Sequence, residues 1–187
     1  MEKPTNIVIV PSPGFLPSIN TNDDLPKGTP LAAHLQLAVT RSLPFIRDAL
    51  KSLSLTSNLV ALYADLFWSD ALICAKELNI LSLIYCPSWV TTLSFCLFLP
   101  KLDQTVVVNT QFKDLHEPIQ IPGCAPINGR DLPNPVQKCK QLLHTNGIIV
   151  NSFKEIEQGP IKALIDETNG YPMVYPIGPI IQTDSTI

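Results

Sequence analysis

The sequence contains no apolar run that approaches the roughly 18 residues needed for a membrane-spanning helix. Its two longest candidates, residues 78–85 and 90–99, are broken or bounded by Asn79, Pro87 and Pro100. The first six residues carry neither the basic region nor the cleavage site of a secretory signal peptide. These absences predict a cytoplasmic protein without a transmembrane segment.

Concentrated positive charge is also absent. The chain has 13 Lys and Arg residues against 16 Asp and Glu residues, a net charge of −3, and its basic residues form no cluster. Binding to nucleic acid or to an anionic membrane surface depends on such a cluster. We therefore expect neither partner.

Metal and disulfide sites lack their usual spacing. The five cysteines form no C-x-x-C pair, and an odd, scattered set is typical of reduced thiols that pack as small apolar side chains. The three histidines, His34, His116 and His144, show no i,i+4 spacing and no Cys/His ligand pattern. The sequence therefore predicts no metal site.

Fingerprints of common nucleotide-binding and hydrolytic sites are missing too. Gly14 follows an apolar stretch, but neither G-x-G-x-x-G nor G-x-x-x-x-G-K-[ST] occurs. Ser12 and Ser88 stand outside any nucleophile-elbow pattern. A dinucleotide site, a P-loop and a serine hydrolase site are therefore unsupported.

What the chain does contain is a regular alternation of apolar elements. With 187 residues, 45% hydrophobic and 16% charged, it is long and apolar enough for one domain with a real core. We predict strands at residues 7–10, 59–64, 80–85, 147–150 and 173–175. Helices are predicted at residues 31–40, from Ser42 onward, at 70–78, 89–98 and 156–166, with 99–146 mostly loop. This alternation predicts an α/β fold with a mostly parallel sheet and flanking helices.

Ligands in such sheets bind beyond the carboxyl ends of the strands, where Asp65 stands out. It directly follows the buried strand 59–64, so it orients a histidine general base, caps the following helix or pairs with a nearby cation. Five aromatic residues either line an apolar pocket for an aromatic ligand or pack in the core: Phe67, Trp68, Trp89, Phe95 and Phe98.

Several ordered motifs resemble plant family 1 UDP-glycosyltransferases, in the branch that glucosylates small phenols. The motifs are IVPSPG (residues 9–14), VTRSLP (39–44), RDAL (47–50), DLF (65–67), LPKLD (99–103), IPGC (121–124), GIIVNSF (147–153) and YPIGP (175–179). Each is weak alone, but they keep the family's order over nearly the whole chain.

The resemblance implies the GT-B architecture, in which an N-terminal Rossmann-like domain binds the acceptor and a C-terminal one holds UDP-sugar. Residues 1–187 would form the acceptor domain alone, and the donor domain would be absent. After the first-strand loop of Ser12, Pro13 and Gly14, the family continues into a Gly-His loop, a helix, a strand and a second helix. Here Gly14 is followed directly by Phe15, so we expect about fifty residues, and the catalytic histidine, to be missing.

The resemblance also assigns roles. Asp65 matches the aspartate of a His–Asp dyad, and Phe67, Phe95 and Cys96 match positions that line the acceptor pocket. Trp89 and Cys96 are residue types not expected there, which affects acceptor preference. The implied reaction needs no cofactor; UDP-sugar is the co-substrate and a small phenol the acceptor.

Three functions remain. The first is a UDP-glycosyltransferase of the phenolic type, inactive as this chain because Asp65 has no histidine to orient. The second is a non-catalytic small-molecule-binding or interaction remnant. The third is a different nucleotide-binding Rossmann enzyme, which the missing glycine fingerprint disfavours. We expect the first.

Overall fold

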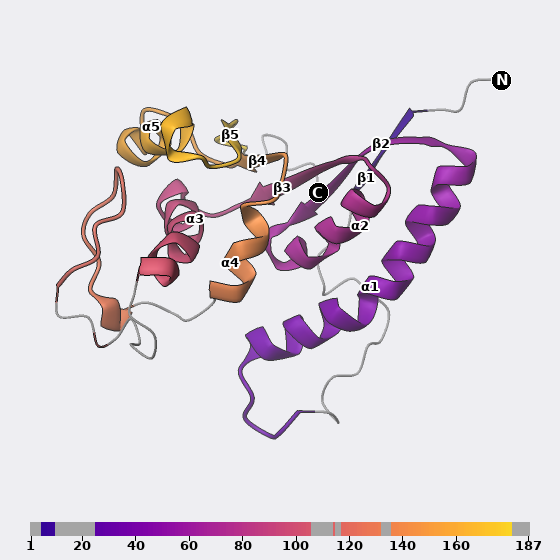
Figure 1. The fold of residues 1–187 in the computed structure, drawn as a ribbon, viewed down its shortest axis with the longest axis horizontal. Coiled ribbons are helices and arrows are strands. Elements are labelled where there is room, and N and C mark those ends of the chain that lie inside the picture. The colour runs from indigo at the N-terminus through magenta and orange to yellow at the C-terminus, as the bar shows by residue number, and fades with distance from the viewer. Residues whose placement is uncertain (1–4, 10–24, 106–113, 115–116, 132–135, 181–187) are drawn as a thin grey trace, which may run out of the picture. The chain divides into compact units, whose positions relative to one another are not determined.

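The computed structural model describes residues 5–9, 25–105, 114, 117–131 and 136–180 (Figure 1). The predicted loop of Ser12, Pro13 and Gly14 lies outside these residues. The chain divides into two compact units, residues 1–85 and 86–187. No helix in the described part is long and apolar enough to cross a membrane.

The first unit is built on three parallel strands. Strand β1 (Thr5–Ile9) pairs with β2 (Asn58–Asp65), and β2 pairs with β3 (Leu81–Cys86). Two helical elements lead from β2 towards β3, the 3-10 helix η2 (Leu66–Ala71) and helix α2 (Leu72–Glu77). The strands 59–64 and 80–85 predicted from apolar runs are therefore confirmed to within one or two residues.

Helix α1 (Leu31–Thr56) corrects one prediction, because residues 31–40 and the stretch from Ser42 onward form one helix of 26 residues. Ser42 caps nothing; its hydroxyl donates to the carbonyl of Ala38 at 2.7 Å, within the same helix. Pro44 lies inside the helix, which bends near its middle in Figure 1. A proline removes one backbone hydrogen bond and bends a helix without always ending it.

Residues with almost no exposed surface form the core of the first unit. Leu50 of α1, Leu62 of β2, Trp68 of η2 and Ile84 of β3 are at most 1% exposed. Helices α1 and α2 both contact β2. The alternate residues of β3 are more open, since Leu81 is 53% exposed whereas Ser82 is buried. One face of this strand is therefore only partly covered, which is unusual for a parallel sheet.

The second unit contains two parallel strands, β4 (Gly147–Val150) and β5 (Met173–Pro176). Its helices are α3 (Val90–Thr105), α4 (Val136–Leu142) and α5 (Gln158–Ile165), with short 3-10 turns at Gly129–Asp131 and Glu167–Asn169. The sequence placed strand 147–150 correctly, and its strand 173–175 ends one residue short of β5.

The prediction that residues 99–146 are mostly loop is wrong at both ends. Helix α3 continues through Pro100 to Thr105, and α4 occupies Val136–Leu142. Leu93 and Leu97 of α3 are fully buried, and α3 packs against α4. Burial of this apolar helix outweighs the local cost of Pro100.

In the second unit, hydrogen bonds join Cys86 to the segment that follows β4, and that segment to the one that follows β5. The amide of Asn151, after β4, donates to the carbonyl of Cys86 at 3.1 Å. The amide of Gly178, after β5, donates to the carbonyl of Ser152 at 2.8 Å, and the Asn151 side-chain oxygen accepts from the amide of Ile180 at 2.7 Å. These bonds satisfy backbone groups that the strands leave unpaired.

The carboxylate of Glu157 accepts four hydrogen bonds in this unit. Its Oε2 accepts from the amide of Val90 at 2.8 Å and the hydroxyl of Ser152 at 2.7 Å. Its Oε1 accepts from the amide and the hydroxyl of Thr91, both at 3.0 Å. Glu157 is 7% exposed and therefore caps the start of α3 from 67 residues away in the chain.

The pKa of Glu157 reflects two opposing effects. Burial raises it, but the hydrogen bonds from Thr91, Val90 and Ser152 outweigh burial, so the net shift is downward. The titratable neighbours are the thiols of Cys86 and Cys124, and burial raises both of their pKa values, that of Cys86 to about 11. The thiols are therefore neutral in acid, and Glu157 is the group of this cluster that titrates there.

Replacing Glu157 by Ala should lower the free energy of unfolding by roughly 3 kcal/mol, because two buried amides lose a charged acceptor. Ser152→Ala removes one of the four bonds and should cost about 1 kcal/mol. Urea unfolding at neutral pH measures both. Equal losses for the two variants would contradict the network described.

Acid should erase the advantage of the native carboxylate. A lowered pKa stabilises the fold above the unfolded-state pKa, and this contribution falls as the pH drops through the lowered value. The stability difference between the wild type and Glu157→Gln should therefore shrink below about pH 4.5. Unfolding curves from pH 3 to 7 measure this difference; a constant gap would show that Glu157 does not titrate as described.

Two glycines touch through their backbones in the second unit. Gly123 has φ +75°, and a Cβ on it would collide with the carbonyl of Gly159. A Cβ on Gly159 would come 2.5 Å from the carbonyl oxygen of Gly123. Gly28 in the first unit also has a positive φ, +87°, but open space surrounds it.

Gly28 and Gly123, which both have a positive φ, form a matched pair for a test. Gly28→Ala should cost about 1 kcal/mol, the strain of a left-handed alanine. Gly123→Ala adds a backbone clash and should cost at least about 2 kcal/mol more. Thermal unfolding of the two variants compares them, and similar melting temperatures would argue against the close approach of Gly123 and Gly159.

Candidate functional site

Asp65 is the last residue of β2 and stands at the carboxyl end of the parallel strands of the first unit. Its Oδ1 accepts from the amide of Phe67 at 2.8 Å and from that of Trp68 at 3.2 Å. The side chain therefore caps η2, which was one of the three predicted roles. Among the described residues, the hydrogen bonds of Asp65 go to backbone amides and none to a histidine.

Burial shifts the pKa of Asp65 upward, and the amides of Phe67 and Trp68 oppose this shift only in part. The carboxylate is thus a partly desolvated charge at a strand end. Such a group interacts more strongly with a nearby cation than an exposed carboxylate does. This is the electrostatic property that a partner of an imidazolium requires.

Two tyrosines lie on the strands beside Asp65. Tyr85 of β3 stands opposite Asp65 in the parallel register, and the Tyr63 and Tyr85 rings stack with centroids 6.2 Å apart. Both side chains are half-buried. Burial raises the pKa of Tyr63, so its hydroxyl stays protonated at neutral pH. The strand end therefore combines one carboxylate with an aromatic pair.

Phe67 lies two residues beyond Asp65, on η2, and is 47% exposed. The next residue, Trp68, is fully buried. The structure therefore separates the two aromatic residues: Trp68 belongs to the core, whereas Phe67 is available for a ligand. In the first unit it brings together Asp65 and Phe67 from the set of predicted site residues.

The other predicted pocket residues belong to the second unit. Trp89 directly precedes α3 and is 61% exposed, whereas Phe95 and Cys96 lie on α3 and are half-buried. The carbonyl of Trp89 accepts from the amides of Thr92 at 3.1 Å and Leu93 at 3.2 Å. Trp89 therefore stands where the helix begins, with its indole open to solvent.

Cys96 packs as an apolar side chain and is not a nucleophile. A hydrogen bond with the Cys139 thiol and burial both raise the pKa of Cys96, whereas the same bond lowers the pKa of Cys139. All five cysteines are free, and Cys74, Cys86 and Cys139 are buried. Within the described residues, no group of three or more His, Cys, Asp or Glu side chains could hold a metal ion.

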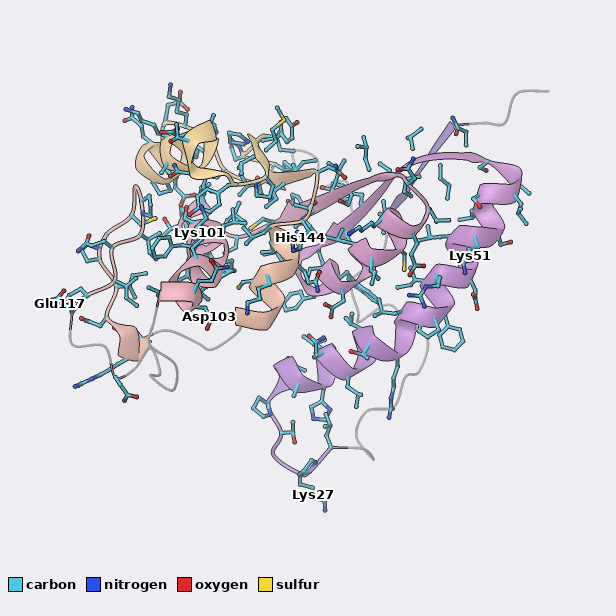
Figure 2. The ribbon with its side chains drawn as sticks, viewed as in Figure 1. Lys27, Lys51, Lys101, Asp103, Glu117 and His144 are labelled. Carbon is cyan, nitrogen blue, oxygen red and sulfur yellow. The ribbon has the colours of Figure 1, made fainter. Side chains whose placement is uncertain are left out.

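The histidines occupy other parts of the chain. His34 lies on α1, and His144 lies in the turn between α4 and β4, where Figure 2 labels it. His116 falls outside the described residues. Asp103 of α3, also labelled, forms an ion pair with the ammonium group of Lys140 of α4 at 3.1 Å, which helps to hold these two helices together.

Sequence reasoning missed Glu157. Ser152, which bonds to Glu157, falls in the motif of residues 147–153, but a glutamate five residues further on gives no periodic or motif signal. Its acceptor role depends on the start of α3, which only the tertiary fold brings near.

Known proteins resemble this chain in sequence and in fold. No protein-family model matches the sequence. Hydroquinone glucosyltransferase of Rauvolfia serpentina is 43% identical over 193 residues, covering 97% of this chain and 39% of that protein. The chain thus spans about two-fifths of the length of the curated relatives that it matches.

Solved structures give the same result. A UDP-glucosyltransferase from Polygonum tinctorium, in complex with 3,4-dichloroaniline, matches with a TM-score of 0.79 and 40% identity over 92% of this chain and 41% of that chain. UGT2 of Phytolacca americana, complexed with UDP-2fluoro-glucose and pterostilbene, matches with a TM-score of 0.83 and 31% identity over 98% of this chain and 56% of that chain. The predicted α/β class is confirmed, and the fold corresponds to part of the GT-B architecture. In sequence and in fold, the chain therefore belongs to the plant family 1 UDP-glycosyltransferases.

Proposed function

We propose that the chain is the acceptor-binding part of a cytoplasmic UDP-glycosyltransferase that transfers glucose from UDP-glucose to a hydroxyl of a small phenol. The observation that carries this proposal is the 43% identity to a hydroquinone glucosyltransferase along 97% of the chain. Asp65, at the end of a buried parallel strand, supplies a carboxylate where ligands bind in such folds.

The phenolic acceptor follows from the kinds of ligand named for the relatives. The Rauvolfia relative is named for hydroquinone, and the Polygonum enzyme is described as capable of glucosylating indoxyl. Both are small aromatic compounds that carry a hydroxyl group. Phe67 in the first unit and Trp89 in the second each expose an aromatic surface of the kind that suits a flat, uncharged ring.

In the proposed reaction, a histidine base removes the proton of the phenol, and the phenolic oxygen attacks the anomeric carbon. UDP leaves from the opposite side, so the configuration inverts. Asp65 stabilises the imidazolium that forms, and its partial burial strengthens that interaction. The resemblance places this histidine in a segment missing between Gly14 and Phe15, so we propose that the 187-residue chain binds acceptors without turnover.

The partly covered face of β3 supports this incompleteness. Leu81 is 53% exposed, and Leu83 and Tyr85 are half-buried, although helices normally cover both faces of a parallel sheet. Loss of a helix that packs on such a face leaves apolar surface of this kind.

Turnover tests the proposal directly. The protein is incubated with UDP-glucose and hydroquinone, and the hydroquinone glucoside is quantified by mass spectrometry. We expect no product above a reaction without protein, because Asp65 alone does not abstract the phenolic proton. Steady product formation that Asp65→Asn abolishes would contradict the proposed inactivity and would require another base in the chain.

Two substitutions separate the cap from the charge of Asp65. Asp65→Ala removes the acceptor of two amides and should lower the free energy of unfolding by about 1 kcal/mol, whereas Asp65→Asn keeps the cap and should cost less than about 0.5 kcal/mol. Because the pKa of Asp65 is raised, the wild type should lose stability relative to Asp65→Asn as the pH rises through that pKa. Chemical unfolding from pH 3 to 7 measures both effects, and equal losses for the two variants would disprove the cap.

A further inference from the structure

Trp89 presents an exposed indole on a backbone that hydrogen bonds hold on its C-terminal side. The two amides that follow it, those of Val90 and Thr91, both donate to the Glu157 carboxylate, at 2.8 and 3.0 Å. Its own carbonyl accepts from Thr92 and Leu93 at 3.1 and 3.2 Å. The side chain is nevertheless 61% exposed. A tryptophan at such a position offers a ligand a large, rigid aromatic surface.

The constraint on this backbone comes from one buried carboxylate. Glu157 is 7% exposed and accepts four hydrogen bonds, two of them from the backbone at the start of α3. The fourth bond, from Ser152, ties the same carboxylate to the residue that follows Asn151 at the end of β4. Glu157 therefore links the start of α3 to the β4 end of the second unit.

We propose that Glu157 is a positioning residue for the aromatic acceptor, because its carboxylate fixes the backbone from which Trp89 presents its indole ring. This inference rests on the proposed function, in which that ring contacts a phenol. Pre-ordering a contact residue increases affinity by removing the entropy that binding would otherwise cost. Glu157 touches neither the acceptor nor the sugar in this account and acts through Trp89.

Glutamine is the informative replacement for Glu157. Glu157→Gln keeps the size and one acceptor oxygen, but it places an amide N–H₂ where at least one of the four donors needs an acceptor. The start of α3 should loosen without a cavity forming. Leu142→Ala is the matched control, because it truncates a buried side chain of α4 in the same unit and leaves all four donors to Glu157 in place.

Fluorescence reports separately on Trp89. The chain has two tryptophans, and Trp68 is fully buried, so acrylamide quenches chiefly the Trp89 emission. In Glu157→Gln, the quenchable emission should show faster local rotation in time-resolved anisotropy. Leu142→Ala should leave this rotation unchanged. Unchanged rotation in Glu157→Gln would overturn the positioning role whatever the ligand.

Hydroquinone binding, measured by calorimetry on the full 187-residue protein, completes the test. Glu157→Gln should raise Kd about tenfold, and Leu142→Ala should leave it within about twofold. In a Trp89→Ala background, Glu157→Gln should have no further effect, because the two residues act through one path.

The outcomes separate the two proposals. An unchanged Kd in Glu157→Gln, or a tenfold loss that persists in the Trp89→Ala background, would overturn the positioning role and leave the phenolic acceptor standing. Absence of hydroquinone binding by the wild type would overturn the proposed phenol site itself, and the acceptor role of Glu157 with it.

Discussion

The second unit depends on the hydrogen bonds that the buried carboxylate of Glu157 accepts. Four donors, from Val90, Thr91 and Ser152, meet its two oxygens. The first amides of a helix have no intrahelical partners. Burying such an amide without an acceptor destabilises the fold by more free energy than most single contacts contribute. Glu157 resolves this problem for α3, and it does so from a segment that follows β4, so the fold of the unit and the cap of the helix form together.

Asp65 plays the comparable part in the first unit, but at a partly open position. It caps η2 through Oδ1, and burial holds its pKa above the ordinary value. Glu157 accepts four bonds and its pKa falls, whereas Asp65 accepts two and its pKa rises. A partly buried carboxylate with few hydrogen-bond partners can still interact with a further cation. A pKa perturbed in this way is typical of functional rather than purely structural sites. One residue thus suits both a structural cap and the dyad role that the family resemblance implies.

How far the sequence predicts this molecule depends on the range of the forces involved. Strands such as β2 and β4 could be predicted because a short apolar run by itself indicates a buried strand. Asp65 could be found because it ends such a run. Helix α1 was divided at Ser42 because local capping signals ignore the packing that carries a helix through Pro44. Helix α4 was missed because seven residues give too short a period to recognise. Glu157 was missed because two of its three partner residues, Val90 and Thr91, lie 67 and 66 residues away.

Amide hydrogen exchange of Val90 and Thr91 tests the central claim most directly. If Glu157 fastens the start of α3, both amides exchange as slowly as those of the buried strand β4, and Glu157→Ala makes them exchange at least a hundredfold faster while β4 keeps its protection. Exchange of Val90 and Thr91 at the rate of open loops in the wild-type protein would contradict the account, because the bonds to the carboxylate would then not hold the helix in solution.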